Sequence, residues 1–216
     1  MRRCRRFVIR RRSYRSLSSP SLFPPSLQRL GSWAHRFLGE ALGDGDLAVD
    51  LTAGNGHDTL FLWQQVAPSG EVVAFDLQEE ALVSCQRRLT EAAVPLSPTP
   101  AAGSVSLVAE SHENLEGYLT RPPRAVIANL GYLPGSHSSL ATEASTSVAA
   151  LTSALDLLAG GGRLAVTVYS LHPGAAQEAA AVTALFSSLS PNEWETLQLQ
   201  LPNRKTPPSL LMARKR

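Results

Sequence analysis

After residue 26 the chain alternates between short apolar runs and longer segments in which apolar residues recur every three to four positions. Short apolar runs predict buried strands, and the longer period predicts amphipathic helices. We expect strands at 47–51, 71–76, 105–109, 124–129, 163–169, 194–200 and 209–214. We expect helices at 27–42, 57–66, 79–92, 114–119, 143–159 and 175–188. This alternation predicts an α/β fold with a mostly parallel seven-stranded sheet and helices on both faces.

The N-terminal segment differs in composition from the rest of the chain. The first 36 residues carry ten arginines, and no acidic residue occurs before Glu40. An arginine- and serine-rich, acid-free beginning with scattered apolar residues is typical of a mitochondrial transit peptide. We therefore interpret 1–26 as a transit peptide or disordered leader and 27–216 as one domain. A nucleic-acid-binding arm and a plain disordered extension stay open as alternatives, because clustered arginines bind phosphate wherever they occur.

Charge, cysteine content and hydropathy argue against a disulfide framework, a metal site and a membrane span. Beyond the first 36 residues the chain holds ten basic residues and all 18 acidic ones. Two cysteines, Cys4 and Cys85, are too few for a disulfide framework or a cysteine-based zinc site, and no two histidines lie close together in the sequence. We expect no metal. Because no apolar run approaches the roughly 20 residues of a membrane span, we expect no membrane partner.

The most informative segment runs from Val49 to Thr59, where an apolar strand meets a glycine-containing turn and then an amphipathic helix. Gly54 and Gly56 allow backbone N–H groups to approach a ligand where a Cβ would collide. Asp76 ends the next strand, where a carboxylate binds ribose hydroxyls in nucleotide-binding α/β folds. Thr59 stands where a dinucleotide motif has its third glycine, which disfavours NAD. By itself the glycine segment is equally compatible with a plain strand-to-helix turn.

A second turn follows the apolar strand before Asn129 and continues to Gly135. It should lie at the carboxyl edge of the sheet, where open α/β folds bind ligands. There the Asn129 amide can hold a substrate amine, and Tyr132 offers a stacking face for a base. His172 follows the fifth strand at the same edge and is a candidate for substrate contact. The alternatives are an ordinary turn for the Asn129 segment and a buried structural role for His172.

Several segments together resemble the bacterial YtqB/MnmM family, long described as rRNA methylases. The resemblance covers about residues 27–216. Its matching stretches are Asp50–Thr59, Phe75–Gln78, Ser111–Leu115, Asn129–Gly135, Gly161–Leu164, His172–Gly174, Asn203 and Pro207–Pro208.

This resemblance implies a class I S-adenosylmethionine-dependent methyltransferase with a Rossmann-like fold, so that 27–216 would be the methyltransferase domain. The implied reaction is methylation of the 5-aminomethyl group of a wobble (2-thio)uridine in tRNA. It also implies that the segment from Asn129 to Tyr132 faces the donor methyl group and the substrate amine. Together with His172, which is selected by its position, Asn129 and Tyr132 are the candidate catalytic residues. The implied cofactor-binding residues are Gly54, Asn55, Gly56, Asp58, Thr59, Asp76, Gln78, Ser111, His112, Asn129, Leu130 and Gly131.

With the N-terminal leader, the resemblance places the enzyme in the mitochondrial matrix, acting on the anticodon region of tRNA. Binding RNA needs basic side chains on a domain that is net acidic. Arg204 and Lys205, with Arg121 and Arg124, are the candidates, unless they are only solvated loop charges. N-methylation of a small molecule or a protein, and a cofactor-binding scaffold without turnover, stay open as alternatives. The oligomeric state is open, a homodimer being one arrangement.

Overall fold

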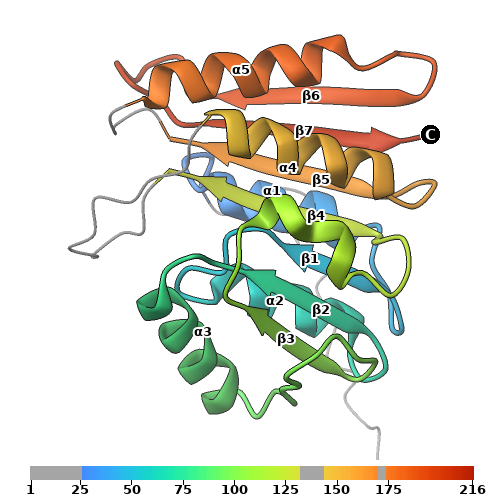
Figure 1. Ribbon diagram of the computed structural model, residues 1–216. Coiled ribbons are helices and arrows are strands. Elements are labelled where there is room, and N and C mark those ends of the chain that lie inside the picture. Colours follow the sequence, from blue (N-terminus) through green and yellow to red (C-terminus); the bar gives the residue numbers. More distant parts are fainter. Residues whose placement is uncertain (1–25, 132–143, 170–173) are drawn as a thin grey trace, which may run out of the picture.

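The computed structural model describes residues 26–131, 144–169 and 174–216 (Figure 1). Within these segments seven strands form one sheet in the order β3-β2-β1-β4-β5-β7-β6. The strands are β1 Leu47–Asp50, β2 Glu71–Phe75, β3 Ser104–Val108, β4 Ala125–Leu130, β5 Arg163–Val168, β6 Trp194–Gln200 and β7 Ser209–Lys215. All seven expected strands are confirmed, and their ends differ from the expected ones by at most one residue.

The sheet is mostly parallel, as expected. Strands β1 to β5 run in one direction, with Val49 of β1 opposite both Val73 of β2 and Val126 of β4. Strand β7 lies between β5 and β6 and is antiparallel to both. The interior strands are buried on both faces, which explains their nearly continuous apolar sequences, whereas the edge strand β6 is largely exposed.

Helices cover both faces of the sheet (Figure 1). They are α1 Leu30–Gly39, α2 His57–Val66, α3 Glu79–Glu91, α4 Ala144–Leu157 and α5 Ala175–Ser188, with a 3₁₀ helix, η1, at His112–Tyr118. Helix α1 is shorter than its apolar pattern predicts, and the segment expected at 114–119 begins two residues earlier because Ser111 caps it. None of the helices in the described segments is long and apolar enough to cross a membrane.

Two apolar cores lie on opposite faces of the sheet. Leu47, Val49 and Leu51 pack in the core under α4 and α5, whereas Ala48 packs in the core under α1, α2 and α3. Successive strand residues point to opposite faces, so a single strand supplies both cores. The sheet and its two helical layers therefore form one rigid support for the loops at its edges.

The carboxyl ends of the five parallel strands meet at one edge of the sheet, which we call the carboxyl edge. Strands β2 and β3 extend the sheet on one side of β1, and β4 and β5 extend it on the other. The winding direction therefore reverses between β1 and β4. In open α/β sheets such a reversal leaves a crevice where ligands bind. The loops after Asp50 and Leu130 lie at this point.

Candidate functional site

Asp50, the last residue of β1, stabilises the glycine turn between β1 and α2 through hydrogen bonds. One carboxylate oxygen of this fully buried residue accepts the Thr52 N–H at 3.0 Å, and the other accepts the Thr59 hydroxyl at 2.7 Å. Burial, followed by the neighbouring Asp58 carboxylate, raises the pKa of Asp50 to about 7. Thr59 is also fully buried, so its hydroxyl supports the turn rather than lining the carboxyl edge.

Gly56 is the residue that fits this turn against α3. It begins α2 with a left-handed φ of 74°, and a Cβ placed on it would lie 2.9 Å from both the Cα and the Sγ of Cys85. Asn55 is held from the same helix, because Ser84 Oγ donates to its side-chain oxygen at 3.0 Å and Arg88 Nε to its carbonyl at 2.6 Å. The shape of the turn is therefore set by its contacts with α3.

Asp76 connects the end of β2 to the glycine turn. Its Oδ2 accepts the Gly54 N–H at 2.9 Å, and its Oδ1 accepts the Gln78 N–H at 3.0 Å. A carboxylate has about four lone-pair positions, so each oxygen retains capacity for a further donor such as a ribose hydroxyl. Asp76 thus occupies the place expected from the sequence and lies beside the residues expected to bind with it.

Ser111 and His112 follow β3 at the same edge. The Ser111 hydroxyl donates to the Glu113 carboxylate at 3.1 Å and accepts the Glu113 N–H at 3.4 Å, which caps η1. His112 is buried, and its Nε2 has no hydrogen-bond partner among the described residues. Burial lowers the pKa of His112, against the effect of a hydrogen bond with the Leu51 backbone. A buried ring nitrogen without a partner is suited to receive a polar ligand atom.

Asn129, near the end of β4, is fixed by two hydrogen bonds. Its backbone N–H donates to Thr52 Oγ1 at 2.8 Å, and its Nδ2 donates to Asp58 Oδ2 at 2.5 Å. Because an ionised carboxylate only accepts, the amide must turn Nδ2 towards Asp58 and leave Oδ1 on the other side. Asn129 therefore presents an acceptor oxygen whose orientation the protein sets.

Two further residues at this site were missed by sequence reasoning. His35 of α1 places Nε2 2.5 Å from Asp58 Oδ1, although 23 residues separate the two in the chain. Tyr169 follows β5 and is 43% exposed at the carboxyl edge. Desolvation by burial, and then the charge of Asp58, raise the pKa of Tyr169. No local pattern distinguishes His35, whereas the position of Tyr169 at a strand end was an available signal.

The other expected site residues divide into two groups. Leu130 ends β4 and Gly131 follows it at the carboxyl edge, where the Leu130 carbonyl accepts the Tyr169 N–H at 3.3 Å. Tyr132 and His172 lie outside the described residues. Among the residues that the structure does describe, no group of histidine, cysteine or carboxylate side chains is arranged to hold a metal ion.

The four candidate RNA-binding cations do not lie together. Arg204 and Lys205 are in the β6–β7 loop, which lies at the carboxyl edge because Gln200 and Ser209 pair next to the end of β5. In contrast, Arg121 pairs with Glu71, and the Arg124 guanidinium donates to the Gly160 carbonyl at 2.5 Å. These contacts place Arg121 and Arg124 at the opposite edge, so the basic surface expected from all four is wrong.

Comparisons with known proteins identify the family of this chain. The profile of the family described as "Putative rRNA methylase" matches residues 72–215. A chloroplastic tRNA (mnm(5)s(2)U34)-methyltransferase of Arabidopsis thaliana is 32% identical over 190 residues, which cover 85% of this chain and 68% of the relative.

Two solved structures share the fold at comparable identity. The putative rRNA-methylase of Clostridium thermocellum superposes with a TM-score of 0.79 at 30% identity, covering 87% of this chain and 97% of that one. A putative methyltransferase of Streptococcus mutans, solved in complex with SAH, gives a TM-score of 0.77 at 34% identity, covering 87% and 98%. The family expected from the sequence motifs is confirmed, and the chain belongs to the rRNA methylase family.

Proposed function

We propose that the protein transfers a methyl group from S-adenosylmethionine to the amine of a 5-aminomethyl substituent on the wobble uridine of tRNA. Family and fold make the chain an S-adenosylmethionine-dependent methyltransferase. The Arabidopsis relative is named for the wobble-uridine reaction, which supports the same substrate here. The observation that carries the proposal is the Asn129–Asp58 hydrogen bond, because it leaves an oriented acceptor oxygen beside the glycine turn.

The described residues fit the methyl donor. Asp76 has unused acceptor capacity for the ribose hydroxyls. On the side expected for the adenine, the buried His112 Nε2 has no partner in the part of the chain that the structure describes. Gly54, whose N–H Asp76 accepts, has no side chain at the turn, and Gly56 lets the turn pack closely against Cys85 of α3. We assign donor binding to these residues with Asn55, Asp58, Gln78, Ser111, Leu130 and Gly131, and to Thr59 through its support of the turn.

When bound, the donor supplies a sulfonium-activated methyl group, so the protein's main task is to position the acceptor nitrogen. Asn129 Oδ1 would accept one N–H of the neutral amine and direct the nitrogen lone pair towards the methyl carbon. The nitrogen–carbon bond forms as the carbon–sulfur bond breaks, and the product ammonium then loses a proton. Holding two reactants in such an alignment supplies a large part of a catalytic rate enhancement. Tyr132 and His172 are proposed to contact the acceptor nucleotide.

The reaction is tested by incubating purified protein and S-adenosylmethionine with tRNA that carries the 5-aminomethyl group and with the same tRNA that lacks it. We expect mass spectrometry of the digested nucleosides to show one added methyl group at the wobble uridine of the first tRNA only. Methylation of a different nucleoside would contradict the proposed substrate and identify that nucleoside as the substrate instead. Methylation only of a small amine or a protein would instead support the alternative acceptor class.

Asp76→Ala is expected to weaken S-adenosylmethionine binding by on the order of 1–3 kcal/mol, because charge-assisted hydrogen bonds to the ribose are lost. Isothermal calorimetry measures the effect. Glu80→Ala is the matched control, since it removes an exposed carboxylate from the first turn of α3, the helix that follows Asp76. Equal affinity for wild type and Asp76→Ala would remove Asp76 from the donor site.

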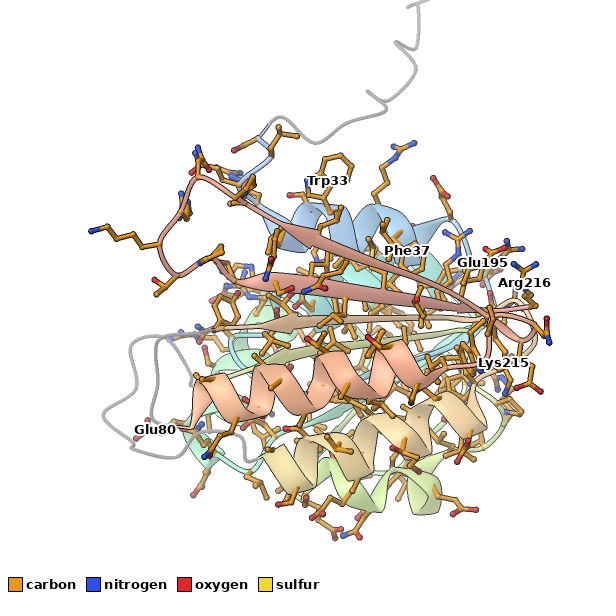
Figure 2. All side chains as sticks on the ribbon, turned by 90° about the horizontal axis from the view of Figure 1, so that it is seen from above. Trp33, Phe37, Glu80, Glu195, Lys215 and Arg216 are labelled. Atoms are coloured by element: carbon orange, nitrogen blue, oxygen red, sulfur yellow. The ribbon has the colours of Figure 1, made fainter. Side chains whose placement is uncertain are left out.

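Arg204→Ala/Lys205→Ala is expected to weaken tRNA binding about fivefold, which corresponds to about 1 kcal/mol for two exposed cations. If both contact phosphate, the slope of log affinity against log salt should also become shallower by about 0.7 for each contact. The matched control is Arg214→Ala/Arg216→Ala, whose side chains pair with Glu195. Figure 2 shows Glu195 and Arg216 at the end of the sheet away from Glu80. A larger loss of tRNA affinity in the control variant would mean that the RNA-binding surface lies at that end of the sheet.

We propose further that residues 1–26 direct the protein to the mitochondrial matrix. The arginine-rich, acid-free composition supports this, and the Arabidopsis relative is named as chloroplastic, which supports delivery to an organelle. A fluorescent fusion of the full chain should co-localise with a matrix marker, and a fusion that starts at residue 27 should not. If removing 1–26 leaves the location unchanged but weakens tRNA binding, the segment is a nucleic-acid-binding arm instead.

A further inference from the structure

His35 is held in one orientation by two contacts from α2. Its Nε2 is 2.5 Å from Asp58 Oδ1, and its ring is stacked on Phe61 with centroids 3.9 Å apart and planes 2° from parallel. The stack sets the plane of the imidazole, and the hydrogen bond sets its rotation within that plane. The side chain is 30% exposed, so it is neither deeply buried nor fully open to solvent.

The two carboxylate oxygens of Asp58 bind different residues: Oδ1 is hydrogen-bonded to His35 and Oδ2 to Asn129. Rotation of an aspartate carboxylate about its last bond has a broad, two-fold profile, so one hydrogen bond alone leaves the plane poorly defined. Two donors on opposite oxygens define it. His35 thereby determines how Asp58 receives Asn129 Nδ2, and so where Asn129 Oδ1 points.

We infer that His35 is a positioning residue for methyl transfer, which acts through Asp58 on the Asn129 amide without touching either substrate. This inference rests on the proposed function, because it assigns Asn129 Oδ1 to the acceptor amine. The alternative for His35 is a packing role between α1 and α2, for which only the stack on Phe61 would matter. The hydrogen bond and the stack can be removed separately.

Two substitutions separate these roles. His35→Phe keeps an aromatic ring for Phe61 but removes the N–H, whereas His35→Gln keeps an N–H near the Nε2 position but removes the ring. We expect His35→Phe to lower kcat about tenfold, with KM for the donor and for tRNA changed by less than about twofold, because alignment is lost and binding is kept. We expect His35→Gln to recover kcat to within about threefold of wild type. Arg36→Ala is the control on the same helix and should keep wild-type kcat.

A second readout does not depend on the acceptor. The side-chain amide signals of Asn129 in a ¹⁵N-labelled protein should move in His35→Phe and return towards their wild-type positions in His35→Gln. Wild-type kcat and an unmoved Asn129 signal in His35→Phe would overturn the inference. So would a His35→Gln variant as slow as His35→Phe at the same melting temperature. If the wild type does not methylate the tRNA while the Asn129 signals respond as expected, the proposed substrate is wrong. The role of His35 in orienting the Asn129 amide is then still supported.

Discussion

Asn129→Ala is expected to cut the rate of methyl transfer to tRNA at least tenfold while leaving S-adenosylmethionine affinity nearly unchanged. The lost group is the amide oxygen that the Asp58 hydrogen bond orients towards the acceptor. An interaction made chiefly when the acceptor is aligned lowers kcat rather than donor binding. Single-turnover kinetics at saturating donor measure the chemical step, and calorimetry measures donor affinity.

A suitable control for this substitution is Asn114→Ala, which removes an exposed amide that donates to Glu110 at 3.2 Å in η1. It should retain both activity and donor affinity. If Asn129→Ala transfers methyl groups at the wild-type rate, the acceptor is held by other residues of the carboxyl edge. Loss of donor affinity together with the rate would instead make Asn129 a donor-binding residue.

Gly56→Ala is expected to lower the free energy of unfolding by about 2–5 kcal/mol and to abolish measurable donor binding. An L-residue in the left-handed region costs about 1–2 kcal/mol, and crowding of a packed interior costs a further 1–3 kcal/mol or so. The new Cβ would meet the backbone Cα of Cys85 at 2.9 Å, and a backbone atom cannot move aside without shifting α3. Urea denaturation measures the loss.

Gly174→Ala separates the two costs of that substitution. Gly174 begins α5 with a φ of 81°, as Gly56 begins α2 with 74°, but a Cβ at Gly174 would meet nothing within 4 Å. The control should therefore show only the backbone cost of about 1–2 kcal/mol. Equal losses in the two variants would mean that α3 yields to the extra methyl group, and that the close approach of Gly56 to Cys85 does not shape the turn.

Local sequence was sufficient for the elements and for part of the site. Short apolar runs indicate buried strands and a near-four-residue apolar period indicates amphipathic helices, so all seven strands were located from the sequence. Asp76 and Asn129 were expected at the carboxyl edge for a related reason, since polar residues at the ends of apolar strands lie at the edge of a parallel sheet. Gly54 and Gly56 marked the turn through their conformational freedom.

The tertiary structure alone decided the strand order, the reversal between β1 and β4, and the antiparallel insertion of β7 between β5 and β6. These depend on contacts between segments far apart in the chain, which no local pattern encodes. Packing between distant segments also decided individual positions. The Thr59 hydroxyl lies inward on Asp50, Arg121 and Arg124 lie at the edge opposite Arg204, and His35 meets Asp58 because α1 packs beside α2. The sequence determined which residues carry reactive groups, and the packing of helices on the sheet determined which of those groups meet.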